Sequence, residues 1–429
     1  MIFLEEAKAD APWKETLPTG WRLSRLKSVA NIRYGLGQPP PGLDTGVAMV
    51  RATDIDAGII RTEKLLRIDP QELPRDRNPY LKAGEIIVVR SGAYTGDSAI
   101  VPLNLEGAVA GYDMVVTVTR AAPRYVAYCL LSQHVLEDQI YLLTLRAAQP
   151  HLNAEELGSV ILALPPSSRE QECIVAYLDA SCAALDASIT TKRQQLETIN
   201  ALRQSTLHQA FAELNQWPTE RVKDISFKIG SGVTPEGGAA GYLDSGIPLL
   251  RSQNVHFDGL RLDDVAYISN ETHAAMSSSQ LCPKDVLLNI TGASIGRCTF
   301  VPEDFGEGNV NQHVCIVRPG PKINHRFLTS FLSSPMGQDQ VFSTFTGASR
   351  QGLSHKELGL IRIPLPPLEV QLSVVTAIEQ ISMKHQNVSQ CIESQIENLV
   401  AYRKSLIYEC VTGKRRITER ELNQVQAHA

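Results

Sequence analysis

The sequence predicts two mixed α/β domains, each followed by a long helix, with the two helices paired as an antiparallel coiled coil. Three observations lead to this fold class. The chain has 429 residues, more than one ordinary domain. It carries an internal repeat at an offset of about 200 residues. Each copy ends in a long segment with apolar residues three and four apart. These features predict a molecule with pseudo-two-fold symmetry.

Five blocks recur in the same order in both halves. The clearest covers residues 84–96 and returns as 284–296, at an offset of 200. The other matches are 100–102 with 300–302, 49–55 with 249–255, Gly35 and Gly37 with Gly230 and Gly232, and 152–166 with 353–367. So many ordered blocks at nearly one offset indicate a duplicated chain.

The first part of each copy has the pattern of a compact α/β domain. Short β-branched runs bounded by Gly, Pro and Asn are typical of strands, and longer segments between them have helical spacing. The expected strands are 86–89, 115–118, 286–288 and 314–317, and the expected helices are 124–138 and 324–342.

The second part of each copy begins after a double proline, which ends the preceding strand. Residues 169–213 predict a helix of 45 residues, roughly 67 Å long. Its apolar stripe is Leu178, Cys182, Leu185, Ile189, Leu196 and Ile199, interrupted by Lys192. The second helix has Val374, Ile378, Ile381, Val388, Ile392, Leu399 and Leu406, interrupted by His385.

These stripes could be buried against the chain's own globular domains, as in most amphipathic helices. Length argues against that interpretation, because a domain of roughly 150 residues has a radius of gyration of only about 15 Å. We therefore expect the helices to bury their stripes against each other and to hold the two domains apart. An antiparallel pairing fits the connectivity most easily. The expected segments are domain 1 at 1–165, helix 1 at 166–214, domain 2 at 215–366, helix 2 at 367–416 and a tail at 417–429.

Composition is typical of a globular protein, with 43% hydrophobic and 20% charged residues. No run approaches the ~20 apolar residues of a membrane span, and the N-terminus does not resemble a signal peptide. We therefore expect a cytoplasmic protein with no membrane partner. The eight cysteines are scattered without zinc spacing and are expected to be reduced, buried thiols. A net charge of −5 disfavours strong phosphate binding by this chain alone.

The sequence lacks the motifs of a catalytic site. Asn78-Pro79-Tyr80 approaches the methyltransferase Asn-Pro-Pro-Tyr turn but lacks the second proline. Thr412-Gly413-Lys414 lacks the rest of a phosphate loop and instead predicts a helix C-cap. The ten histidines form no metal-binding motif. We expect no catalytic residue, no metal and no cofactor.

The combination of layout and motifs resembles the specificity subunit of type I restriction-modification enzymes. Copy 2 carries most of the resemblance in residues 229–235, 246–251, Gly292 with Gly296, Asn311-Gln312, 365–368 and 411–414. Copy 1 keeps 17–21, Arg51, Gly92, Gly96, Pro165-Pro166, Glu170-Gln171 and Leu178-Asp179. It departs in Ala110-Gly111 and in the end of its helix at 210–214.

The resemblance implies that each domain recognises one half of a bipartite DNA target and that the helices set the separation of the halves. It also implies that partner subunits do the chemistry: two methyltransferase subunits that bind S-adenosylmethionine, and restriction or translocase subunits that bind ATP. This chain would then be a non-catalytic subunit.

Residues suited to DNA readout gather in loops beside the repeat blocks, since Arg reads guanine, Asn and Gln read adenine, and amides or cations hold phosphates. In domain 1 they are Tyr34, Gln38, Arg51, Thr53, Asp54, Arg90, Ser91, Tyr94, Thr95, Tyr112, Asp113, Arg146, Gln149 and His151. In domain 2 they are Ser231, Thr234, Arg251, Gln253, Asn254, Asn289, Thr291, Ser294, Arg297, Asn311, Gln312, His313, Ser349, Arg350 and Gln351.

Some of these residues have a structural alternative. Arg51 and Arg251 occupy the same place in both copies, and we favour structural ion pairs for them. The paired glycines could shape turns or admit a phosphate. Positions that differ between the copies are better candidates for base reading, because two unlike half-sites need two contact sets. They are Arg90/Ile290, Tyr94/Ser294, Asp97/Arg297 and Gly111/Gln312.

Two other functions are compatible with the sequence. The chain could be a coiled-coil adaptor whose duplicated domains bind protein without DNA specificity. It could also be an autonomous modification enzyme, which would have to transfer methyl groups alone.

Overall fold

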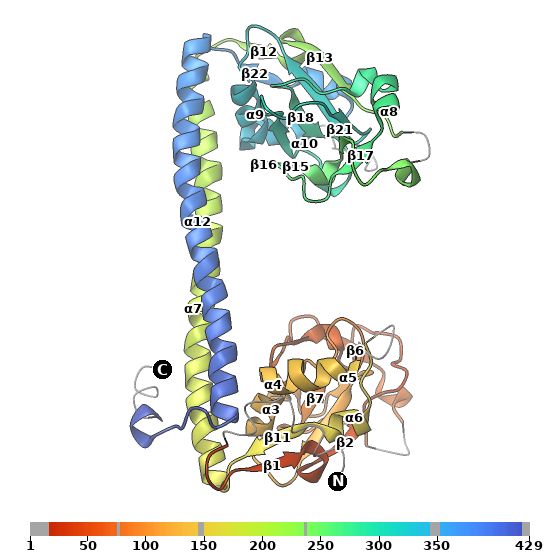
Figure 1. Ribbon diagram of the computed structural model, residues 1–429, viewed down its shortest axis with the longest axis vertical. Coiled ribbons are helices and arrows are strands. Elements are labelled where there is room, and N and C mark those ends of the chain that lie inside the picture. The colour runs from red at the N-terminus through yellow and green to blue at the C-terminus, as the bar shows by residue number, and fades with distance from the viewer. Residues whose placement is uncertain (1–16, 75–77, 145–149, 236–237, 344–351, 423–429) are drawn as a thin grey trace. The chain divides into compact units, whose positions relative to one another are not determined.

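The protein is described by a computed structural model covering residues 17–74, 78–144, 150–235, 238–343 and 352–422. It consists of two compact units. Unit 1 comprises Met1–Arg193 and Ser394–Ala429, and unit 2 comprises Gln194–Glu393. Two long helices, α7 (Ser168–Ala212) and α12 (Leu368–Val411), each contribute one half to each unit (Figure 1).

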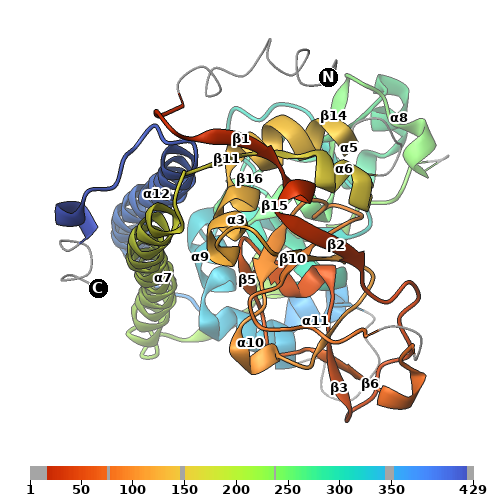
Figure 2. The same ribbon diagram turned by 90° about the horizontal axis from the view of Figure 1, so that it is seen from below.

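The main sheet of unit 1 has four strands in the order β2-β10-β7-β8, all antiparallel. A three-stranded sheet, β6-β3-β9, contains the parallel pair β3 and β9. Strands β1 and β11 form a separate antiparallel pair and lie side by side (Figure 2). The strands are β1 Arg22–Arg25, β2 Ala30–Tyr34, β3 Val47–Val50, β4 Ile55–Asp56, β5 Ile59–Ile60, β6 Leu66–Ile68, β7 Ile86–Val88, β8 Ser98–Ile100, β9 Val109–Ala110, β10 Met114–Val118 and β11 Ile161–Leu164.

Unit 2 repeats this topology strand for strand. Its sheets have the orders β13-β21-β18-β19 and β17-β14-β20, and its two-stranded pairs are β12 with β22 and β15 with β16. The strands are β12 Thr219–Arg221, β13 Ser226–Ser231, β14 Ile247–Leu250, β15 Val255–His256, β16 Gly259–Leu260, β17 Ala266–Ile268, β18 Val286–Asn289, β19 Cys298–Phe300, β20 Asn309–Val310, β21 Val314–Pro319 and β22 Arg362–Pro364. The predicted duplication and mixed α/β class are confirmed.

The predicted helices at 124–138 and 324–342 are each interrupted. Unit 1 has α3 (Pro123–Leu131), then α4 (Gln133–Val135), a π-helical turn η5 (Leu136–Tyr141) and α5 (Leu142–Thr144). Unit 2 has α9 (His325–Ser333) and α10 (Pro335–Ser343). The periodicity of apolar residues does not reveal the break, because the apolar residues keep their helical spacing before and after it.

A serine in extended conformation stands at each break. The Ser132 hydroxyl donates to the Cys129 carbonyl, and the Ser334 hydroxyl donates to the Phe331 carbonyl. Each hydroxyl therefore bonds to the last turn of the first helix and caps it. The short helices α6 (Ala154–Ser159), α8 (Asn270–Ala275) and α11 (His355–Leu360) complete the units.

The match of Gly35 and Gly37 to Gly230 and Gly232 is wrong by two residues. Gly35 N donates to the Asp113 carbonyl, and Gly232 N donates to the Asn311 carbonyl. A Cβ at either position would lie within 3.0 Å of backbone carbonyl oxygens. Gly35 and Gly232 are thus the equivalent pair, because this close approach to backbone requires glycine.

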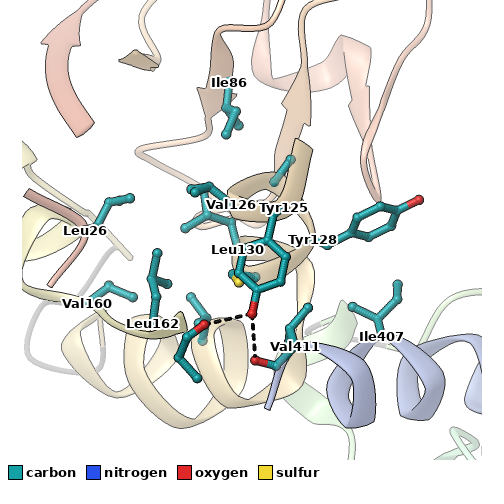
Figure 3. Packing of buried hydrophobic residues seen from close by; sticks show 14 of the residues in the cluster. Leu26, Ile86, Tyr125, Val126, Tyr128, Leu130, Val160, Leu162, Ile407 and Val411 are labelled. Atoms are coloured by element: carbon teal, nitrogen blue, oxygen red, sulfur yellow. Dashed lines mark hydrogen bonds between the residues drawn. The ribbon is translucent and has the colours of Figure 1, made fainter. Parts of the chain in front are cut away.

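In unit 1 the beginning of α7 and the end of α12 pack together and also join the core of the globular domain. Leu178 and Cys182 of α7 and Leu406 and Val411 of α12 belong to one buried cluster with the domain's strands. The fully buried Tyr125 connects them: its hydroxyl donates to the carbonyls of Ala163, at 2.8 Å, and Val411, at 3.3 Å (Figure 3).

Unit 2 repeats this arrangement with the end of α7 and the beginning of α12. Phe211 of α7 is fully buried, and its ring lies edge-on to Phe327 and Phe331 of α9, with centroids 5.3 and 5.2 Å apart. Val375 and Ile378 of α12 join the same cluster. The helices pair antiparallel in each unit, as expected, but length did not exclude burial against the globular domains. Their ends also complete the domain cores.

The seam of α12 differs from the predicted stripe at two positions. Ile381 and Val388 are 37% and 49% exposed. Ser382 and Ser389 lie in the half-buried positions instead, and His385 and Ile392 are on the seam as expected. The prediction chose the apolar residue three positions after Ile378 and after His385. The half-buried residue is instead the serine four positions after each of them.

Length and composition make α7 the one described helix that could cross a membrane. This is weak support for a span, because core helices of globular proteins meet the same criterion, and Leu178, Cys182 and Ile189 are buried in the fold. Helix α12 ends as predicted, with Gly413 at φ 77° after Val411.

The buried cysteines are Cys129, Cys182, Cys298, Cys315 and Cys410, and burial raises the pKa of Cys298 to about 12. Cys391 is exposed, contrary to expectation.

Candidate nucleic-acid interface

The candidate readout residues of unit 1 meet at one end of its main sheet. Tyr34 ends β2 and Met114 begins β10, and these residues pair with each other; Met114 also pairs with Val88, which ends β7. Arg90 and Tyr112 therefore flank the same sheet end as Tyr34. The strand pairing brings Tyr34 to Arg90 and Tyr112, from which it is more than fifty positions apart in sequence.

Arg90 is held there by aromatic rings and by an imidazole. Its guanidinium carbon lies 4.7 Å from the centre of the Tyr34 ring and 4.3 Å from that of Tyr112, which is cation–π distance. Nη2 of Arg90 lies 3.2 Å from Nε2 of His151, whose Nδ1 lies 2.9 Å from the Ser91 hydroxyl. Because a guanidinium can only donate, His151 must accept at Nε2 and carry its proton on Nδ1.

Asp113 is a buried carboxylate beside this cluster. One oxygen accepts from the Arg90 backbone N–H at 3.2 Å, and only 2% of the residue is exposed. Burial raises the pKa of Asp113 to about 6, while the backbone hydrogen bond and the nearby Arg90 charge act in the opposite direction.

Unit 2 builds a different polar chain at the equivalent sheet end, where Ser231 and Leu288 both pair with Cys315. The Thr234 hydroxyl donates to the Gln312 carbonyl oxygen. The Gln312 amide lies 3.0 Å from Nε2 of His313, and Nδ1 of His313 is hydrogen-bonded to the Thr291 hydroxyl. With the amide as donor, His313 also carries its proton on Nδ1.

Arg51 and Arg251 have structural partners, as favoured above. Arg51 donates through Nε and Nη2 to the two oxygens of Asp54 at 3.1 Å each. Arg251 donates to the Asp264 carbonyl at 2.9 Å and lies over the ring of Tyr242. Sequence patterns did not identify Tyr242 or Asp264, because neither is in a repeat block.

The paired glycines shape turns, since Gly92, Gly96, Gly292 and Gly296 all have φ between 76° and 91°.

Several candidates are occupied inside the protein. Asn289 is fully buried and donates to the Ser252 carbonyl and the Ser294 hydroxyl. Asn311 is 7% exposed and accepts from His313 N, and the Thr95 hydroxyl donates to the Gly92 carbonyl. Exposure of only 0% and 7% leaves Asn289 and Asn311 little surface for direct contact with DNA, whereas Thr95 is half-buried and stays a candidate.

The remaining candidates differ in accessibility. Gln38, Thr53, Tyr94 and Gln253 are exposed, whereas Ser231 and Arg297 are half-buried. Gln253 donates to the Asp264 carboxylate. Arg146, Gln149, Ser349, Arg350 and Gln351 lie outside the described residues.

The described parts of the chain contain no group of three or more His, Cys, Asp or Glu side chains that could hold a metal ion. At the near-miss methyltransferase turn, Asn78 accepts from Tyr80 N at 3.0 Å. That side chain is therefore used to close its own turn.

Comparisons with known proteins agree with this architecture. The family model for the type I restriction modification DNA specificity domain matches residues 18–199 and 247–398, well over half of the chain. The Escherichia coli EcoBI specificity subunit is 28% identical over 58% of this chain, but this chain covers only 56% of that relative's length. The putative MjaX specificity subunit of Methanocaldococcus jannaschii is 21% identical over 97% of this chain and 100% of that protein.

Solved structures also match. One of them belongs to a study of complex assembly and conformational transition of the type I R-M system and has a TM-score of 0.73. It covers 92% of this chain and 98% of that one at 20% identity, so this likeness concerns the fold alone.

Proposed function

This chain belongs to the type I restriction modification DNA specificity family, and from that premise we propose that it is the subunit that reads a bipartite DNA target. In this proposal each unit recognises one half of the target. The chain recruits two methyltransferase subunits and the restriction or translocase subunits, which carry out the chemistry. The complex then acts in the cytoplasm.

One observation carries the proposal: the two units share a fold but end their main sheets in unlike polar groups. Unit 1 presents Arg90 with two tyrosines, and unit 2 presents Gln312 with His313 and two threonines. A common scaffold with different hydrogen-bonding groups is what two unlike half-sites require.

The net charge of −5 supports a division of labour between this chain and its partners. Phosphate contacts by Lys and Arg provide much of the affinity of DNA-binding proteins. A chain of this charge can supply specificity while methyltransferase subunits supply many of the phosphate contacts.

A binding experiment tests the proposal. The affinity of the purified chain for target and random duplexes is measured alone and with its methyltransferase, the target having been identified by mapping methylated sites in the host. We expect weak binding alone, and tight, target-specific binding by the complex. Equal affinity with and without the partner would contradict the division of labour. Absence of any DNA preference in the complex would favour a protein-binding adaptor, and methyl transfer by the chain alone would indicate an autonomous enzyme.

A further inference from the structure

The two sheet ends share an arrangement of side chains that the alignment of the two copies does not show. In unit 1 the imidazole on the Ser91 hydroxyl is His151, which lies just before the N-cap of α6. In unit 2 the imidazole on the equivalent Thr291 hydroxyl is His313, which comes from the turn before β21. Unrelated segments thus place an imidazole on the same hydroxyl position.

Each imidazole uses its other nitrogen to accept from one planar side chain. Nε2 of His151 accepts from Arg90, and Nε2 of His313 accepts from the Gln312 amide. A hydroxyl, an imidazole and a planar group therefore follow one another in both units. The planar group is a guanidinium in unit 1 and a carboxamide in unit 2.

Both planar groups keep unused hydrogen-bonding capacity. The Arg90 guanidinium has no carboxylate within ion-pair distance among the described residues, and its shielded Nε also lacks a described partner. Gln312 is exposed and uses one amide hydrogen and one carbonyl lone pair internally. One donor and one acceptor of Gln312 remain.

Resting on the function proposed above, we propose that Arg90 reads a guanine in one half-site and Gln312 reads an adenine in the other, both through the major groove. A guanidinium can donate to O6 and N7 of guanine at once. A carboxamide can accept from N6–H and donate to N7 of adenine. The imidazoles and the tyrosine rings fix the planes of these groups before DNA arrives, which lowers the ordering cost of binding.

The test uses the complete complex of this chain with its methyltransferase subunits. Methylated sites are mapped in a host carrying wild type, Arg90→Lys or Gln312→Leu. Arg90→Lys keeps the charge but loses the planar fork, so we expect the preference for guanine at one position of one half-site to fall about tenfold to 100-fold. Gln312→Leu should relax an adenine in the other half-site only.

Base analogues give a second readout that a merely structural role would not move. Replacing the target guanine with 7-deazaguanine removes N7 and should weaken binding of wild type but not of Arg90→Lys. Deaza-adenine at the other position should likewise distinguish wild type from Gln312→Leu. Replacing the target guanine with inosine, which keeps O6 and N7, should leave the affinity of wild type unchanged.

One variant serves as a control. Arg120→Lys changes an exposed arginine past the opposite end of β10 and should leave the motif unchanged. The proposal is overturned if the motif of Arg90→Lys or Gln312→Leu is unaltered, or if either weakens all sequences alike, as loss of a phosphate contact would. A wild-type complex that marks no bipartite motif would instead refute the proposed function itself.

Discussion

At the scale of the residue, the copies keep a buried carboxylate and change its partner. Glu85 forms an ion pair with Arg33 of β2, with 2.9 Å between Oε2 and Nη2. Asp285, at the equivalent position, forms an ion pair with Arg318 of β21, with 2.8 Å between Oδ1 and Nε. The carboxylates are 6% and 0% exposed. A buried charge must be paired, but any neighbouring strand that reaches it can supply the cation.

Asp113 gives a prediction at the same scale. Because burial raises its pKa to about 6, above the unfolded value near 4, its contribution to stability is present below about pH 4 and is lost as the pH rises through 6. The free energy of unfolding of wild type, relative to Asp113→Asn, should therefore fall by up to about 3 kcal/mol between pH 4 and 7. Calorimetry of both proteins across this range measures it. A difference that is independent of pH would contradict the expectation.

At the scale of the element, the long helices are fastened to their domains in the same way twice. The Gln171 side chain accepts from Ala122 N, and the Gln371 side chain accepts from Asn324 N, both at 2.8 Å. Eight residues further along each long helix there is an ion pair with the domain. Arg124 pairs with Asp179 of α7, and Arg326 pairs with Glu379 of α12. Each helix is thus positioned by hydrogen bonds as well as by apolar packing.

The register of the α12 seam can be tested by a matched pair of substitutions in unit 2. Ile392 is 7% exposed and Val388 is 49% exposed. Ile392→Ala should lower the free energy of unfolding by about 2–3 kcal/mol, because it removes buried methylenes. Val388→Ala should change it by less than about 0.5 kcal/mol. Thermal unfolding of the full chain measures both values, and comparable losses would show that Val388 is part of the seam.

At the scale of the whole molecule, the number of phosphate contacts sets how binding responds to salt. The logarithm of the binding constant falls with the logarithm of salt concentration in proportion to the number of phosphates neutralised. For a chain of net charge −5 we expect a shallow slope alone and a steeper one for the complex with methyltransferase. Titrating salt in a DNA-binding assay measures both slopes, and identical slopes would place the phosphate contacts on this chain.

The sequence by itself determined the duplication, the mixed α/β class and the long helices. The physical reason is that these features depend on local spacing: glycine turns, β-branched runs and apolar periodicity are written in neighbouring residues. The double prolines and Gly413 located helix ends for the same reason. Arg90 and Gln312 were identified as candidates because the two copies differ there.

Only the tertiary structure decided which side chains meet. Strand pairing placed Tyr34, Arg90 and Tyr112 at one sheet end, and it brought His151 to the hydroxyl that His313 reaches from another segment. The tertiary structure also buries Asn289 and leaves Val388 of α12 exposed, against expectation. Such contacts are set by packing between segments distant in sequence, so no local pattern of residues records them.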